Sequence, residues 1–111
     1  MLIYKILRDP EWSAFDAAGE TAGAPIDLAD GYIHFSTAAQ AAETAAKHFA
    51  GAEGLWLLAV ATERLGDLRW EASRGGQLFP HLYGVLQREH VVWARPLPLG
   101  EDGHVFPEEM A

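Results

Sequence analysis

The chain has 111 residues, half of them apolar, so it can bury one hydrophobic core and is too short for two. The formal net charge of −8 disfavours non-specific binding to nucleic acids and to anionic membranes. The absence of cysteine excludes disulfide bonds, thiolate catalysis and thiolate metal sites. We therefore expect a single domain over residues 1–111 that is stabilised by packing alone.

The first 30 residues predict a strand, a short helix and a loop. Residues 2–7 form an apolar run typical of a strand. Asp9 and Pro10 follow as an N-cap and a first helical residue, and Gly19 is expected to end the helix. Residues 20–30 show no periodicity, so we predict irregular backbone of a length that often borders functional sites.

The middle of the chain predicts a second strand and helix and the centre of the sheet. Residues 31–35 read as a strand, and the capping-box pattern of Thr37 and Gln40 predicts that a helix follows over 38–50. Residues 55–61 are apolar on both faces, which is typical of a central strand.

The last 45 residues contain weaker strand signals, at 69–71, 91–94 and 103–106. About five strands and two helices in mixed order predict an α+β domain with one twisted mixed β-sheet. No stretch approaches the ~18 apolar residues of a membrane span, and the first residues do not resemble a signal peptide. We therefore expect a cytoplasmic, bacterial-type protein, and the sequence leaves its oligomeric state open.

A first cluster of candidate functional residues surrounds the predicted second strand. Tyr32, His34 and Ser36 share one face of that strand by alternation, and Thr37 begins the helix. Free N–H groups and hydroxyls at a helix N-terminus favour an anion or a phosphate. The alternative is that Ser36 and Thr37 only cap the helix and that His34 is an ordinary sheet residue.

A second cluster follows the glycines at 75 and 76. His81 and Tyr83 share a side if their segment is extended, offering an imidazole that titrates near neutrality and a phenol. Arg74 can bind an anion bidentately, and Trp70 lies close enough in sequence to contact a ligand. The alternative is a surface loop with a salt bridge and ordinary packing at the margin of the sheet.

No established catalytic or cofactor motif is present, such as a phosphate-binding loop or a dinucleotide glycine fingerprint. A metal site can be drawn from His34, His81 and His104, but no spacing imposes it, and we predict none.

Three segments resemble a known family: residues 3–6, Asp30 to Thr37 and Phe79 to Gly84. They look like the domain-of-unknown-function family 952, small bacterial proteins without an established activity, and the likeness covers nearly the whole chain. This family is grouped by structure with the ADP-ribosylation fold of ADP-ribosyltransferases and NAD-dependent RNA 2′-phosphotransferases. The resemblance therefore implies an ADP-ribosylation-like fold and NAD as a possible cofactor.

The resemblance also implies roles for individual residues. Lys5 stands on the strand that holds the dinucleotide in those enzymes, and the step from His34 to Thr37 matches their strand-to-helix junction. The segment from Gln87 to Glu89 is the only one that resembles the region of the glutamate that holds the ribose in those enzymes.

Two hypotheses from different classes follow, with a purely structural domain as a third. In the first, a cleft lined by these residues binds a nucleotide-like or phosphorylated small molecule, and an ADP-ribosyltransferase-like transferase or a hydrolase uses His34 and His81 to move protons. In the second, the same cleft is a catalytically inactive module that binds a ligand or a protein. Both require His34 and His81 to share one cleft, with Lys5, Ser36, Thr37, Trp70, Arg74 and Tyr83 as ligand contacts.

Overall fold

The computed structural model describes residues 1–108 and residue 110, apart from the side chain of Arg74. Its strands are β1 (Leu2–Arg8), β2 (Glu20–Thr21), β3 (Ile33–His34), β4 (Leu55–Ala61), β5 (Leu68–Ala72), β6 (Leu78–Leu82), β7 (Leu86–Gln87), β8 (Val91–Leu97), β9 (Leu99–Gly100) and β10 (Gly103–His104). Its α-helices are α1 (Asp9–Ala18), α2 (Pro25–Asp30) and α3 (Ala38–His48). Three 3-10 turns complete the elements: η1 (Thr62–Arg64), η2 (Arg74–Gly76) and η3 (Arg88–His90).

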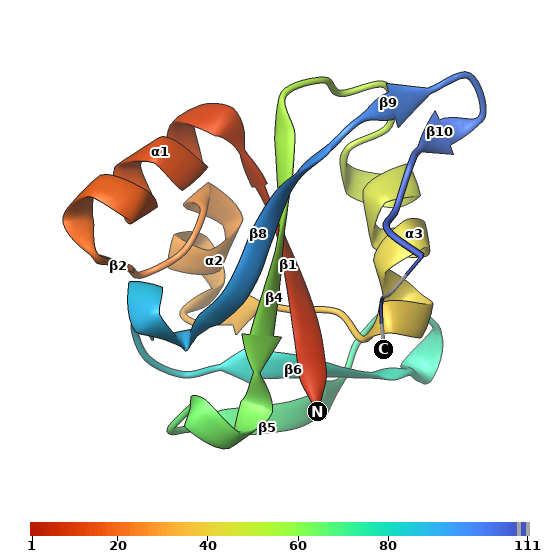
Figure 1. Cartoon of the computed structure of the whole chain (residues 1–111). Helices are drawn as coiled ribbons and strands as arrows, with labels where there is room; N and C mark the ends of the chain where they lie inside the picture. The colour runs from red at the N-terminus through yellow and green to blue at the C-terminus, as the bar shows by residue number, and fades with distance from the viewer. Residues whose placement is uncertain (109, 111) are drawn as a thin grey trace.

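Two three-stranded sheets form the framework of the domain. One has the order β1-β4-β8 and the other the order β3-β6-β5, and every pairing in both is antiparallel. Figure 1 shows β6 and β5 running across the lower end of β1 and β4, with α1 and α2 on one side of the upright sheet and α3 on the other. The α+β class of the single domain is confirmed, whereas the single mixed sheet that we expected is replaced, in the described residues, by these two antiparallel sheets and two antiparallel strand pairs, β2-β7 and β9-β10.

The two sheets join at a single pair of residues in the described part of the chain. Tyr4 of β1 and Ser36, just after β3, exchange two backbone hydrogen bonds of 2.7 and 2.8 Å. Beyond this bridge β1 and β3 belong to different sheets, so their next residues are not paired with one another. The open angle between the two strands is where polar side chains of both can meet.

The hydrophobic core occupies both faces of the upright sheet. On β1, Ile3 and Leu7 pack with α1 and β6 on one face, while Tyr4 and Ile6 pack with α3 on the other. The central position predicted for residues 55–61 is confirmed, because β4 pairs with β1 on one side and with β8 on the other. Lys5 lies among these apolar residues of β1 and is itself buried.

The segment 20–30, predicted to be irregular, contains α2. Pro25 occupies the first turn of this helix and Gly31, with φ of 86°, ends it. This is the usual asymmetry of proline at the start and glycine after the end, compressed into six residues without a visible apolar period. The described residues therefore contain three α-helices instead of about two.

The caps of the other helices differ in detail from the expectation. Asp9 is the first residue of α1 rather than its N-cap, and its carboxylate accepts a hydrogen bond from Nε1 of Trp56 (2.9 Å). The side chain of Gln40 accepts the backbone N–H of Thr37 (3.0 Å), as the capping-box pattern predicts. None of the helices in the described part of the chain is long and apolar enough to cross a membrane.

Truncation of the central strand should destabilise the domain far more than truncation at the surface. Leu58 of β4 has no solvent exposure, so Leu58→Ala is expected to lower the free energy of unfolding by about 2–5 kcal/mol through lost burial and a residual cavity. Val92→Ala, at a position 46% exposed on β8, is the control and should change it by less than about 1 kcal/mol. Urea denaturation measures both, and equal losses would contradict this description of the core.

Candidate functional site

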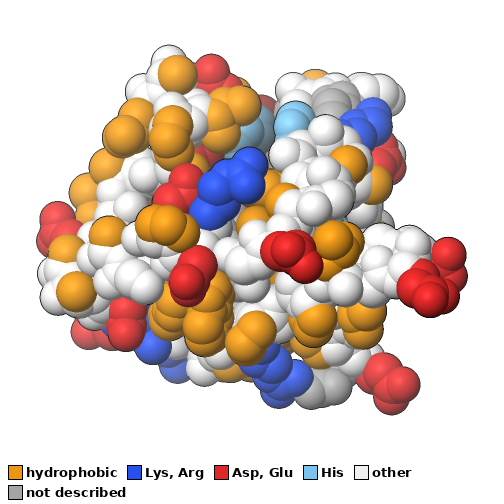
Figure 2. Space-filling view, turned by 90° about the horizontal axis from the view of Figure 1, so that it is seen from above, with side chains coloured by type: hydrophobic (Ala, Val, Ile, Leu, Met, Phe, Trp, Pro, Cys, Tyr) orange, Lys and Arg blue, Asp and Glu red, His pale blue; other side chains and the backbone are white. Residues whose placement is uncertain are grey.

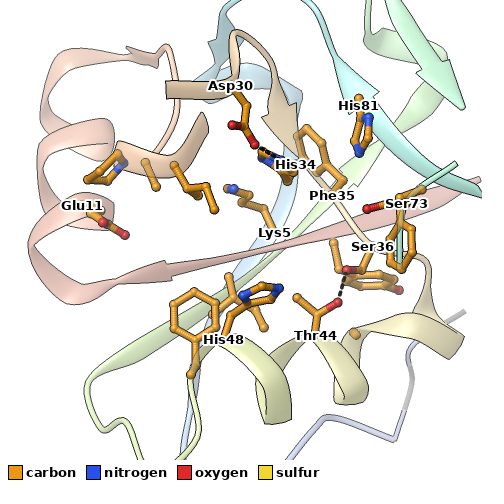
Figure 3. A pocket seen from close by; sticks show the side chains of 18 of the residues that line it. Lys5, Glu11, Asp30, His34, Phe35, Ser36, Thr44, His48, Ser73 and His81 are labelled. Atoms are coloured by element: carbon orange, nitrogen blue, oxygen red, sulfur yellow. Dashed lines mark hydrogen bonds and ion pairs between the residues drawn. The ribbon is translucent and has the colours of Figure 1, made fainter. Parts of the chain in front are cut away.

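A cavity of about 520 Å³ lies where β1 and β3 diverge, between α2 and α3. In the view from above, the surface is hollowed there, with histidine side chains inside the hollow and a Lys or Arg side chain beside it (Figure 2). In the close-up, Lys5 and His34 lie on one side of the cavity, His81 next to them, and Thr44 and His48 of α3 opposite (Figure 3). Titratable groups from four elements therefore meet in one space that is open to solvent.

Lys5 and Asp27 form a buried ion pair next to the cavity. The Lys5 ammonium lies 2.7 Å from Oδ2 of Asp27, and the two side chains are 7% and 0% exposed. Burial lowers the pKa of the Lys5 ammonium, and the charge of Asp27 opposes this shift. The pair fixes α2, which carries Asp27, against β1.

Asp27 also binds His34 on the neighbouring strand. His34 donates to Oδ1 of Asp27 both from its backbone N–H (3.1 Å) and from Nδ1 of its ring (2.6 Å), while Nε2 lies 3.0 Å from Oδ2 of Asp30. Both ring contacts are hydrogen bonds only when both ring nitrogens carry protons. Burial by itself raises the pKa of Asp27, but the bonds from His34 and the Lys5 ammonium lower it to about 2.

The chain closes tightly around Asp27 from the other side. The backbone N–H of Ala24 donates to Oδ2 of Asp27 (2.8 Å), and Gly23 approaches the same side chain. A Cβ atom on Gly23 would lie 2.4 Å from Cβ of Asp27, and Gly23 has φ of +114°, a conformation that other residues rarely adopt. Glycine at position 23 is therefore required for the position of Asp27.

A second carboxylate–histidine pair lies on the adjacent strands β5 and β6. Glu71 accepts hydrogen bonds from Nδ1 of His81 (2.9 Å) and from the hydroxyl of Tyr83 (2.7 Å). These bonds, from Tyr83 first and then from His81, lower the pKa of the Glu71 carboxyl. The ring of Tyr32 stacks on His81 with 4.2 Å between centroids. His81 is thereby fixed in place and is only 3% exposed.

Four of the eight predicted site residues line this cavity. His34 and His81 are direct partners in the β3–β6 pairing, with 5.3 Å between ring centroids, so they stand side by side on one wall. Lys5 and Ser36 join them, and the hydroxyl of Ser36 bonds to that of Thr44 on α3 (2.8 Å). The polar face that alternation predicts for Tyr32, His34 and Ser36 extends onto the neighbouring strand β6, where His81 pairs with His34.

The other predicted contacts are placed differently. Thr37 lies at the start of α3, outside the cavity lining, and Trp70 points from β5 to the opposite side from Glu71 by strand alternation. Tyr83 contributes indirectly, through Glu71. Arg74 lies in η2, and its side chain is outside the described part of the structure.

Several residues at the site were not predicted from the sequence. Asp27 stood in a segment predicted to be a loop, and Thr44 and His48 belong to a predicted helix in which no site residue was proposed beyond its start. Glu71 could have been found, because it alternates with Arg69 on the strand next to His81.

The described residues contain no group of three or more histidines and carboxylates that could hold a metal ion. His104, the third histidine of the metal site considered from the sequence, forms a hydrogen bond from Nε2 to the carbonyl oxygen of Ala52 (2.8 Å) and does not line the cavity.

Acid should destabilise the protein through Asp27. Its folded pKa of about 2 lies below the ordinary 3.8, so as the pH falls the unfolded chain takes up this proton first, and the stabilisation present above about pH 5 is lost towards pH 2. The difference in pKa corresponds to roughly 2 kcal/mol. Asp27→Asn should be less stable at pH 7 and show a weaker loss below pH 5 in urea denaturation. A pH-independent difference between the two proteins would contradict this role.

Gly23→Ala should displace Asp27, because the added methyl group overlaps its side chain. Gly19→Ala is the matched control: Gly19 also has a positive φ, of +83°, but a Cβ there meets nothing within 4 Å. The control should lose about 1 kcal/mol of stability from backbone strain alone, and Gly23→Ala should lose more. Only Gly23→Ala should also shift the NMR signals of the His34 ring, and unchanged His34 signals would refute the contact.

Comparison with known proteins places the chain in a family. Protein CC0527 from Caulobacter crescentus is similar: its X-ray structure has 54% sequence identity and a TM-score of 0.89, covering 94% of this chain and 92% of that one. Its solution NMR structure gives 55% identity and a TM-score of 0.83, with coverage of 93% and 90%. No curated protein matches the chain. The family model described as "Protein of unknown function (DUF952)" matches residues 6–94, and the chain belongs to this family.

Proposed function

We propose that the cavity binds a phosphorylated small molecule and that Lys5 holds its anionic group. The ammonium of Lys5 has three N–H donors, and among the described residues only Asp27 accepts from it. A buried donor without an acceptor is costly. Anionic oxygens in the cavity would satisfy the two remaining donors, and these donors are the observation that supports the proposal most directly.

The other side chains of the cavity fit such a ligand. Ser36 and His81 contribute further polar atoms to the lining of the cavity. Arg8 also lines it, with its guanidinium 5.1 Å from the centre of the Phe49 ring. Aromatic and aliphatic side chains make up much of the remaining wall, Phe35 and Phe79 among them. A small molecule with one anionic and one apolar part matches this distribution.

The anion is expected at Lys5 instead of at the N-terminus of α3. The cavity meets α3 on its side, at Ala41, Thr44 and His48, and the first residues of the helix lie outside the lining. The proposal therefore keeps the phosphate expected from the sequence and changes the group that holds it.

The resemblance to ADP-ribosyltransferases supplies a finer version of this proposal, with NAD as the ligand and ADP-ribose as the transferred group. Glu89, the echo of their ribose-binding glutamate, lies in η3 and does not line the cavity. Binding of NAD and an ADP-ribosylation-like fold therefore stay predictions, as do a cytoplasmic location and the absence of non-specific nucleic-acid binding. A catalytically inactive binding module fits the same geometry and differs only in showing no turnover.

Removing the charge of Lys5 should weaken the binding of phosphorylated ligands. The test is a titration followed by two-dimensional NMR, with inorganic phosphate, AMP, ADP-ribose and NAD as separate probes. Because Lys5→Met alone leaves Asp27 as a buried unpaired charge, the informative variant is Lys5→Met combined with Asp27→Asn. A hydrogen bond to a charged group is worth about 1.5–3 kcal/mol, so this variant should bind at least about 10-fold more weakly.

Lys47→Met is the control, since Lys47 is half exposed on α3 and pairs with Glu43 outside the cavity. The signals that move on titration should be those of residues 5, 34, 36 and 81. Release of free nicotinamide from NAD would identify the transferase version of the proposal. Equal affinity of the double variant and the wild-type chain, or the absence of binding by all four probes, would refute the proposal.

A further inference from the structure

The Glu71–His81 pair gives one nitrogen of the cavity a defined chemical state. The carboxylate of Glu71 is ionised and can only accept, so Nδ1 of His81, 2.9 Å away, carries the proton. In the neutral imidazole the lone pair then lies on Nε2. Among the described residues Nε2 has no hydrogen-bond partner, although His81 lines the cavity.

The surroundings of His81 hold this arrangement from every side. Tyr32 of the segment before β3 stacks on the ring with an interplanar angle of 19°, and His34 meets it edge-on. Tyr83 shares the carboxylate of Glu71, and the Arg69 guanidinium lies 4.1 Å from the centre of the Tyr83 ring. The ring is thus fixed by stacking and by a hydrogen bond, with one nitrogen left for a cavity group.

The neighbouring His34 is in the opposite situation. Both of its ring nitrogens lie within 3.0 Å of carboxylate oxygens, from Asp27 and Asp30, so neither nitrogen is left for a group in the cavity. His81 is therefore the proton acceptor of this wall, and Lys5 is the fixed cation.

The charges around the cavity favour a ligand group with one negative charge over one with two. Two cationic side chains, Lys5 and Arg8, lie at or behind the cavity with three carboxylates, those of Glu11, Asp27 and Asp30. A phosphomonoester carries about −1.5 to −2 charges at neutral pH, whereas a phosphodiester carries one. One negative charge at Lys5 suits these surroundings better than two, and the apolar walls suit the esterified groups.

We infer that the protein hydrolyses a phosphodiester in this cavity. Lys5 holds the phosphoryl oxygens, as in the function proposed above, and His81 acts as general base. Nε2 of His81 accepts a proton from a water molecule as the water oxygen bonds to phosphorus. The bond from phosphorus to one ester oxygen breaks, and its electron pair stays on that oxygen. The leaving oxygen, on the opposite side of phosphorus, takes a proton from water, and Nε2 returns its proton to water, so one water is consumed in total and the products are a phosphomonoester and an alcohol.

Glu71 is a positioning residue in this reaction. It does not touch the substrate but keeps the proton on Nδ1 and the lone pair on Nε2. The same charge balance favours release of the product, because the monoester gains a second negative charge that the cavity does not neutralise.

The test uses the full chain with bis(p-nitrophenyl) phosphate and 2′,3′-cyclic AMP as diesters and p-nitrophenyl phosphate as a monoester. The wild-type chain should hydrolyse the diesters in preference to the monoester. His81→Asn should lower kcat by about 100-fold or more, the usual contribution of a general base. His90→Asn, which changes a histidine of η3 outside the cavity, should leave kcat unaltered.

Glu71→Gln distinguishes a positioning role from a structural one. It should lower kcat with little change in KM, and 15N NMR of the His81 ring should show that the single Nδ1–H tautomer is lost. Thermal unfolding of each variant, compared with the wild-type chain, checks that the fold is retained. An unchanged kcat in folded His81→Asn would overturn the inference.

The binding of dimethyl phosphate separates this inference from the proposed function. If dimethyl phosphate binds at Lys5 and no diester is hydrolysed, the hydrolase inference is wrong and the binding function stands. If no diester is hydrolysed and neither dimethyl phosphate nor any of the four phosphate and nucleotide probes binds, both are wrong. Diester hydrolysis lost in both His81→Asn and Glu71→Gln, with dimethyl phosphate still bound, is the result expected.

Discussion

A carboxylate buried without solvent contact is costly unless every oxygen has a partner, and Asp27 meets this condition with partners from three segments. The ammonium of Lys5, the ring and backbone of His34 and the backbone of Ala24 all converge on it. These contacts tie α2 to both β1 and β3, and α2 is the element that closes one side of the cavity. The position of α2 beside the cavity, the position of the Lys5 ammonium and the orientation of His34 therefore all depend on the side chain of Asp27.

The cavity is a consequence of how the two sheets meet. Because β1 and β3 share only the bridge between Tyr4 and Ser36 in the described part of the chain, residues of the two strands beyond it are not paired with one another, and their polar side chains can meet in the space between. Lys5 and His34 occupy these positions, and His81 enters through its pairing with His34. His34 contacts the carboxylates of Asp27 and Asp30 and His81 that of Glu71, and this difference is the basis of the hydrolase inference.

The sequence predicted what local patterns determine. The apolar run at 55–61 identified the central strand, and alternation identified the polar face of His34 and Ser36. It did not predict α2, whose six residues are too few to show a period, nor Asp27, whose partners lie 22 positions before and 7 after it. Long-range ion pairs leave no trace in local spacing. Trp70 lies outside the cavity lining, because proximity along the chain does not determine which face of a strand a side chain occupies.

The stacking of Tyr32 over His81 has a consequence for proton exchange. Tyr32 covers one face of the imidazole, Glu71 occupies Nδ1 and little surface is exposed, so Nε2 meets water through the cavity. A bound molecule that fills this space would close that route. Nε2 of the imidazole would then exchange protons only with the bound molecule, and not with buffer, until that molecule dissociates.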